Sequence, residues 1–316
     1  MKKEKLLHST KIQQMIAQYK HDMQLVDQLT TDAEPHYEIE QELYKKYEVK
    51  RGLRDLDGKG VRAGLTTISK VSATQIVDGR EVPAAGQLLY RGIPIEQLVQ
   101  GFITHDRFGF EEIVYLLLMG HLPKADQLAQ FKGLLTDYQE LPNHFNSGVI
   151  MKMPSDNIMN TMAKCVLALH AYDPKPDDTS LPNVMRQCIQ LVSQFPSLAV
   201  FGYQASMYFR NDKSMFIQKP DPKLSIAENI LYMMRPDGKY TRLEAKLLDL
   251  CLVLHAEHGG GNNSAFTVHV VSSSGTDTYS TVAAALGSLK GPKHGGANIK
   301  VMEMFEDLKQ HGADWE

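Results

Sequence analysis

The sequence has few cysteines, little net charge and no long apolar run, and each of these shortages excludes a class of protein. Its 316 residues include three cysteines, and 34 basic against 37 acidic residues give a formal net charge of −3. An odd number of distant thiols does not make a disulfide framework, so reduced cysteines, packed as small hydrophobes in a cytoplasmic protein, are expected. The near-balanced charge provides no basic field for nucleic acid or for an anionic membrane.

The N-terminal segment is too polar for a secretory signal, and no later segment has the length and apolarity of a membrane span. Glu4 and the absence of arginine before residue 24 also disfavour a transit peptide. We predict that residues 1–60 form a helical, charged extension. One face of its first helix would carry the apolar residues Leu6, Leu7, Ile12, Met15 and Ile16.

The rest of the chain has mainly helical periodicity, with a short β region near residues 66–91. That region, LTTISKVSATQIVDGREVPAAGQLLYRG, is rich in β-branched residues and contains turn-forming glycine and proline. Apolar residues then recur at helical spacing in residues 110–120, 156–172 and 182–209. We therefore predict a mainly α fold, with a large helical domain over residues 61–293 and a second domain starting at residue 294.

The segment TRLEAKLLDLCLVLHAEHGGGNNS predicts a helix that ends at a polar pocket. Thr241 and Glu244 have the spacing of a capping box at its start. His258 would stand at the end of the helix, where three glycines stop it and let backbone approach a ligand. The predicted buried stripe consists of Leu243, Leu247, Leu250, Cys251 and Leu254, and the predicted pocket groups are Asn262, Asn263 and Ser264. An alternative is a glycine C-cap whose histidine only complements the helix dipole.

The segment KGPKHGGAN places His294 just before a second predicted helix, ANIKVMEMFEDLKQ. The positive N-terminus of that helix and Lys293 favour a neutral imidazole that can donate an N–H to an oxygen gaining negative charge. His258, at a helix C-terminus, is favoured in its protonated form, which suits a substrate carboxylate. Two histidines with separated proton affinities are a common acid–base arrangement.

A zinc site is the competing interpretation, because His255, His258, His269 and His294 could be imagined as ligands. No HExxH arrangement or cysteine pair accompanies them, so we predict no metal and place His255 in the core. The run STVAAALGSLKG contains small residues that allow close helix packing, and we expect it near an interface.

The stretch from His255 to Asn298, with HGGGNNS and GPKHGGAN, resembles the central signature of citrate synthases and 2-methylcitrate synthases. FEEIVYLLLMGHLP and GQLLYRGIPIEQL resemble the N-terminal segments of the same family, so the resemblance runs from about residue 65 to the end. It implies a homodimer that condenses acetyl-CoA with oxaloacetate to citrate and CoA, using no metal or cofactor. It also implies that His294 polarises the thioester carbonyl and that His258 binds oxaloacetate, beside Asn262 and Ser264.

The family pattern also includes an aspartate that removes the α-proton and arginines that hold oxaloacetate, and neither can be matched here. We therefore expect this chain to be a truncated, inactive form, with an incomplete large domain and the first helix of the small one. The alternatives are a propionyl-CoA-specific 2-methylcitrate synthase, a non-catalytic dimerising fragment and an unrelated helical scaffold.

Overall fold

The computed structural model describes residues 65–312 without a gap, residues 40–50, 52–55 and 57–61, and nine single positions between 13 and 31. Residues 1–61 and 62–316 form two separate units. The first contains α2 (Gln41–Lys46) and an isolated β-bridge between Arg54 and Gly60. Of the predicted N-terminal apolar face, Ile16 is described, helical and exposed, and the other four positions lie outside the described residues. The proposed three-part domain division stays a prediction.

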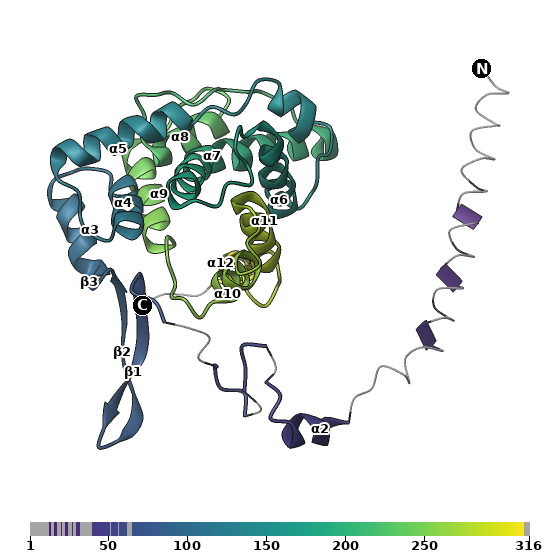
Figure 1. The fold of residues 1–316 in the computed structure, drawn as a ribbon. Helices are drawn as coiled ribbons and strands as arrows, with labels where there is room; N and C mark the ends of the chain where they lie inside the picture. The colour runs from purple at the N-terminus through teal and green to yellow at the C-terminus, as the bar shows by residue number, and fades with distance from the viewer. Residues whose placement is uncertain are drawn as a thin grey trace. The chain divides into compact units, whose positions relative to one another are not determined.

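The second unit is mainly helical, which confirms the predicted fold class (Figure 1). Among the described residues, no helix is both long and apolar enough to cross a bilayer. Its helices are α3 (Ile95–Thr104), α4 (Phe110–Met119), α5 (Ala125–Tyr138), η2 (Asn146–Ile150), α6 (Ile158–Leu169), η3 (His170–Tyr172), α7 (Leu181–Asn211), α8 (Ile226–Met234), α9 (Arg242–Leu254), α10 (Asn263–Ser272), α11 (Thr278–Leu289) and α12 (Ala297–His311).

The predicted β region forms a long antiparallel hairpin with a short third strand. Strands β1 (Ser69–Val77), β2 (Arg80–Tyr90) and β3 (Ile93–Pro94) pair in that order, and Val77 faces Arg80 across the turn. The two turn residues, Asp78 and Gly79, both have positive φ, at 49° and 74°. An Asp-Gly pair suits this turn because glycine and aspartate tolerate the left-handed region that a two-residue hairpin requires.

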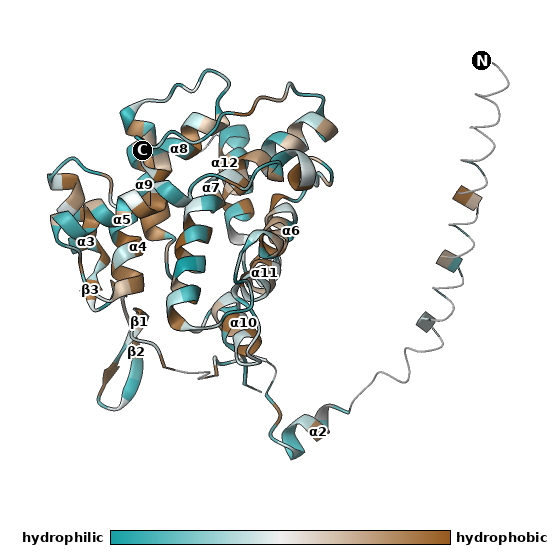
Figure 2. Cartoon of the chain, turned by 45° about the horizontal axis from the view of Figure 1, so that its top comes forward, coloured by the Kyte–Doolittle hydropathy of each residue, from teal (hydrophilic) through white to brown (hydrophobic). Residues whose placement is uncertain are grey.

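Helix α7 passes through the main hydrophobic core of the second unit. It runs for 31 residues and contains Pro196, so one i→i−4 hydrogen bond is missing from its interior. The helices carry hydrophobic and hydrophilic residues on different faces (Figure 2). The largest core cluster includes Phe145, Val166, Leu169, Leu198, Phe201 and Met233.

A buried polar network joins the loop after η3 to α7 and α11. Arg186 donates from Nη2 to both carboxylate oxygens of Asp173, at 2.8 and 2.7 Å. Tyr279 donates its hydroxyl at 2.6 Å and Gln187 its amide at 3.1 Å to the same carboxylate. Burial alone would raise the pKa of Asp173, but these hydrogen bonds lower it to about 2. The network therefore fixes α11 to α7 through a charge that stays ionised.

The prediction of which face of α9 is buried is wrong. Leu243 and Leu247 are 68% and 54% exposed, and Leu254 and Cys251 are also exposed, whereas Leu250 is partly buried. The opposite face packs inward, through Ala245, Asp249 and Val253. The reason is tertiary: the Asp249 carboxylate accepts hydrogen bonds from the backbone N–H groups of Gly109 and Phe110, at the start of α4. The predicted capping box of Thr241 and Glu244 is confirmed.

Candidate functional site

Tyr90, the last residue of β2, anchors the loop that carries His258. The ring is fully buried, and its hydroxyl donates to the carbonyl of Val253 at 2.9 Å. The same hydroxyl accepts a hydrogen bond from the backbone N–H of Glu257 at 3.3 Å. One side chain thus satisfies backbone groups at the end of α9 and in the loop beyond it, which fixes where the loop begins.

The hairpin also contacts the glycines of this loop. Ser69 donates to the carboxylate of Glu257, which accepts a further hydrogen bond from the N–H of Gly259. Gly259 has a φ of +85°, and a Cβ added there would lie 3.6 Å from the side chain of Val71. Gly259 is therefore required by its backbone conformation, which a residue with a side chain rarely adopts.

Asn262 caps the next helix. Its Oδ1 accepts from the N–H of Ala265 at 2.8 Å, and its Nδ2 donates to the carbonyl of Gly259 at 2.7 Å. The neighbouring Asn263 donates to the hydroxyl of Ser288 on α11 at 2.8 Å. The Asn262 side chain, predicted to bind substrate, is thus already engaged in holding the glycine turn and starting α10.

Ser264 and His294 are brought together by the fold. The Ser264 hydroxyl lies 2.8 Å from Nε2 of His294 and 3.2 Å from the carbonyl oxygen of Ala285. Helices α10 and α11 pack side by side, so a residue in the first turn of α10 reaches the end of α11 and the turn after it (Figure 1). Both side chains are partly buried, which leaves the imidazole accessible to a small molecule.

The turn that holds His294 depends on the two glycines that follow it. A Cβ on Gly295 would lie 2.0 Å from the carbonyl oxygen of Leu289, and one on Gly296 would lie 2.7 Å from that of Pro292. Neither position has room for a side chain. Gly296 is the N-cap of α12, so His294 does stand just before a helix N-terminus, as predicted.

His258 lies in the loop between α9 and α10 and is exposed. Helix α9 ends at Leu254, four residues earlier than predicted, with His255 as its C-cap. His258 therefore does not stand at the helix end, and its imidazole has no hydrogen-bond partner among the residues that the structure describes. His255 is exposed rather than in the core, and its Nδ1 lies 2.7 Å from the carbonyl oxygen of Cys251.

Comparison with known proteins decides the family. The family model described as the C-terminal domain of citrate synthase matches residues 53–315. The chain belongs to the citrate synthase family. This confirms the resemblance that the sequence motifs indicated.

Curated members of the citrate synthase family match this chain over most of its length. The 2-methylcitrate synthase 1 of Corynebacterium glutamicum is 32% identical over 275 residues, which is 85% of this chain and 65% of that protein. The citrate synthase of Acidithiobacillus ferridurans is 37% identical over 248 residues, 75% of this chain and 59% of that protein. The matched region thus spans about three fifths of the length of these relatives.

Solved structures of citrate synthases have the same fold. The citrate synthase of Pyrobaculum aerophilum superposes with a TM-score of 0.66 at 29% identity, covering 81% of this chain and 59% of that one. The citrate synthase of Thermotoga maritima gives a TM-score of 0.61 at 28% identity, covering 82% and 61%.

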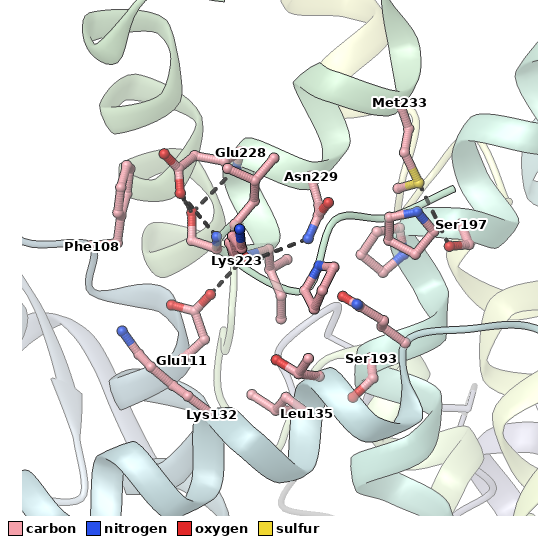
Figure 3. Close-up of a pocket in the computed structure, with 18 residues that line it drawn as sticks. Phe108, Glu111, Lys132, Leu135, Ser193, Ser197, Lys223, Glu228, Asn229 and Met233 are labelled. Carbon is pink, nitrogen blue, oxygen red and sulfur yellow. Dashed lines mark hydrogen bonds between the residues drawn. The ribbon is translucent and has the colours of Figure 1, made fainter. Parts of the chain in front are cut away.

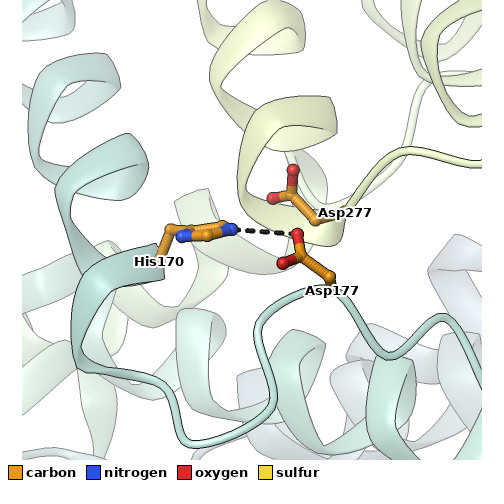
Figure 4. A group of neighbouring side chains, drawn as sticks. All are labelled: His170, Asp177 and Asp277. Atoms are coloured by element: carbon orange, nitrogen blue, oxygen red, sulfur yellow. Dashed lines mark hydrogen bonds and ion pairs between the residues drawn. The ribbon is translucent and has the colours of Figure 1, made fainter.

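The competing zinc interpretation finds no support at the four histidines named for it. In the described part of the chain, His170, Asp177 and Asp277 are the one group of possible ligands close enough for a metal ion (Figure 4). Each of these three groups has a protein partner, because His170 pairs with Asp177 at 3.1 Å and Asp277 caps α11 by accepting from the N–H of Ser280. This group lies at the start of α11, apart from the residues of the predicted site.

Sequence reasoning missed Tyr90 and Glu257, which position the site. Tyr90 stands in the quoted motif GQLLYRG, but nothing in that motif indicates that its hydroxyl bonds to α9, more than 160 residues later. Glu257 falls inside the helix that the sequence predicts, and its pattern gives it no role in the site. The cysteines are free, as predicted, although only Cys165 is fully buried and Cys251 is exposed.

Proposed function

We propose that this chain carries part of the site for a citrate synthase-type condensation, in which the enolate of acetyl-CoA attacks oxaloacetate and thioester hydrolysis gives citrate and CoA. His294 polarises the thioester carbonyl, and His258 binds a carboxylate of oxaloacetate. Membership of the citrate synthase family supports the reaction class. The match to a 2-methylcitrate synthase keeps propionyl-CoA as the alternative acyl donor.

The observation that carries the proposal is the contact between Ser264 and His294. A hydroxyl has one proton, so Ser264 can donate either to Nε2 of His294 or to the carbonyl of Ala285. The distance to Nε2 is shorter, 2.8 against 3.2 Å. If the proton goes to Nε2, the neutral imidazole carries its own proton on Nδ1 and can donate it to the thioester oxygen.

The proton on Nδ1 matters because the α-carbon of a thioester is a weak acid. As its proton leaves, negative charge gathers on the carbonyl oxygen, and a fixed N–H donor stabilises that charge. The rigid glycine turn after His294 reduces the reorganisation needed in that step. Removing one such donor typically lowers turnover by about 100- to 1000-fold.

His258 suits a different task. It is exposed and has no hydrogen-bond partner among the described residues, so its imidazole is free to bind a ligand. Its loop is anchored by Tyr90 and Glu257, which limits how far it can move. An imidazole N–H on an anchored loop can donate a hydrogen bond to a substrate carboxylate.

The tautomer of His294 tests the role of Ser264 directly. Nitrogen-15 NMR of the imidazoles in the 316-residue chain is expected to show His294 protonated on Nδ1 and unprotonated on Nε2. Ser264→Ala should shift this signal towards a mixture of tautomers. Ser273→Ala should leave it unchanged, because Ser273 is an exposed serine at the C-cap of the same helix. A wild-type imidazole protonated on Nε2 would contradict the proposed donor.

Oxaloacetate binding tests the role of His258. Calorimetric titration of oxaloacetate is expected to show weak binding that His258→Ala reduces by at least about tenfold, the effect of losing a charge-assisted hydrogen bond. His255→Ala is the matched control, because His255 is exposed three residues earlier and its ring nitrogen lies against the carbonyl of Cys251 in the preceding helix. Equal losses in both variants would remove His258 from the proposed site.

Turnover by the 316-residue chain alone is expected to be very low, because none of its residues is assigned to removing the α-proton. The assay is thiol release from acetyl-CoA in the presence of oxaloacetate. Robust turnover would show that the chain does contain a base, and His294→Ala should then lower that turnover by about 100-fold or more. A homodimer in the cytoplasm is proposed for the same chain, supported by its family and its free cysteines.

A further inference from the structure

A polar cavity of about 240 Å³ lies among α4, α5, α7 and the start of α8, away from His258, Ser264 and His294 (Figure 3). Charged side chains of both signs line it: Glu111 comes from α4, Lys132 from α5, Lys223 from the loop before α8 and Glu228 from the first turn of α8. The proposed condensation uses none of these residues.

Glu111 is the feature of this cavity that needs an explanation. The residue is 3% exposed, and its Oε1 accepts from the backbone N–H of Ile226 at 2.8 Å. Its other oxygen, Oε2, is buried and has no hydrogen-bond partner among the residues that the structure describes. A buried carboxylate oxygen without a donor is strongly unfavourable, so this oxygen calls for a donor from inside the cavity.

Most other polar groups of the wall are already satisfied by the protein. Ser193 donates to the carbonyl of Ile189, and the Asn229 amide bonds to the backbone of Asp221. Glu228 belongs to the capping box of α8 with Ser225. By contrast, within the described part of the chain, neither Lys132 nor Lys223 has a side-chain hydrogen bond or an ion pair at contact distance, although the charge of Lys132 opposes the rise that burial causes in the pKa of the nearby Asp249.

Among the charged groups of the wall, those without a protein partner at contact distance in the described part of the chain are therefore the buried Oε2 of Glu111, the partly buried ammonium of Lys132 and the exposed ammonium of Lys223, which water can solvate. A purely anionic ligand would pair with the lysines but face the Glu111 carboxylate, and a purely cationic ligand would face Lys132 instead. A single water could donate to Oε2, but it would fill only a small part of the cavity, because a water occupies about 30 Å³ in the liquid.

From this combination we infer that the cavity binds a small zwitterion of amino-acid size. Its ammonium group donates to Oε2 of Glu111, and its carboxylate pairs with Lys132, with Lys223 at the exposed side. Bound there, it bridges α4, α5 and the start of α8, so it stabilises the helices that it joins. This binding site is independent of the proposed condensation.

The test uses the 316-residue chain and defined probes. Glycine, β-alanine and 4-aminobutyrate separate the two charges by successive methylenes, and ethylamine and propionate each carry one charge only. Calorimetry and thermal unfolding are expected to show at least one of the three zwitterions binding with a Kd below about 10 mM and raising the unfolding temperature. Ethylamine and propionate should bind at least about tenfold more weakly.

Substitutions of two residues that line the cavity test where the zwitterion binds. Glu111→Gln and Lys132→Gln should each weaken binding of the best zwitterion by about tenfold or more, the effect expected for a hydrogen bond to a charged group. Glu112→Gln is the control, because Glu112 is the next carboxylate of α4, pairs with Arg107 and does not line the cavity. Circular dichroism checks that each variant folds. If Glu111→Gln does not fold, the binding measured with Lys132→Gln decides the test.

Three results would overturn the inference. Failure of all three zwitterions to bind would mean that the cavity holds water only. Equal binding of ethylamine or propionate would show recognition of a single charge. Unchanged binding in the folded Glu111→Gln and Lys132→Gln variants would place the probe elsewhere on the protein.

Discussion

Replacing Asp173 by asparagine tests the buried network that joins α7 to α11. The substitution removes the charge that accepts hydrogen bonds from Arg186, Tyr279 and Gln187, and it leaves the Arg186 guanidinium without its counter-ion. Breaking a buried ion pair by removing one partner typically costs about 3–5 kcal/mol. Because Arg186 is partly exposed, we expect the free energy of unfolding to fall by an amount near the lower limit of this range, about 3 kcal/mol at pH 7.

The pH dependence of this loss follows from the lowered pKa of Asp173. The pKa is 3.8 for the free carboxyl and about 2 in the fold, a difference equivalent to about 2.4 kcal/mol. Because the folded pKa is the lower one, the stabilisation is fully present above pH 5 and is lost as the pH falls towards about 1. The stability gap between wild type and Asp173→Asn should therefore narrow by about 2 kcal/mol between pH 7 and about pH 2.

Urea unfolding followed by circular dichroism, at pH 7 and at several lower pH values, measures this gap. Asp177→Asn is the control, because Asp177 lies in the same loop but is 79% exposed and, among the described residues, forms an ion pair with His170 alone. An exposed pair of this kind is worth at most about 1 kcal/mol. A gap of the same size at all pH values, or an equal loss in Asp177→Asn, would refute the role given to the network.

Three further predictions concern the site and its assembly. Tyr90→Phe should lower the free energy of unfolding by about 1–3 kcal/mol and speed hydrogen exchange at the amide of Glu257, which loses its acceptor; unchanged exchange would contradict the anchor. Gly295→Ala should be destabilising by more than about 1 kcal/mol, because its Cβ would overlap the Leu289 carbonyl, whereas Gly287→Ala has open space; chemical unfolding compares the two. Sedimentation equilibrium should show a homodimer in which small residues of α11 pack closely, and a monomer over a wide concentration range would count against it.

The sequence predicts the elements of this fold well because their signals are local. Gly120 ends α4 with a φ of 87°, and Thr241 begins α9 with a capping box, as their neighbours in the sequence indicate. The β region follows from its β-branched residues and its turn-forming glycine and proline, whereas its pairing as a hairpin is a finding of the structure. Signals of this kind depend on a few adjacent residues, so they can be read without the rest of the chain.

The buried face of α9 could not be read in the same way. Leucines at helical spacing indicate an apolar face but do not say what covers it, and in this chain that face is exposed. The inward face contains Asp249, whose burial depends on N–H groups of α4 about 140 residues earlier in the sequence. Burial raises the pKa of Asp249, and two backbone hydrogen bonds oppose that rise. The partners that make the burial of this aspartate favourable are distant in the sequence, so the residues around it do not predict that burial.

The candidate site also combines features that the sequence shows with features that depend on tertiary packing. His294, Ser264 and the glycines around them stand out in the sequence, and the family resemblance names their roles. Their contact at 2.8 Å depends on the packing of α10 against α11, and the role of Asn262 as a helix cap is visible only in its hydrogen bonds. Tyr90 is missed because its partner lies in another element.

The β hairpin has a consequence for how this protein behaves at high concentration. In the part of the sheet that the structure describes, β1 pairs with β2 on one side only, so its other edge presents unpaired N–H and C=O groups. Ile76 is 71% exposed near the tip, and Lys70 is the one charged residue in the strand. An open edge with apolar side chains is a template on which a second strand can add, and a single lysine does little to prevent it. The hairpin that anchors the site is thus also the place where self-association through strand addition would begin.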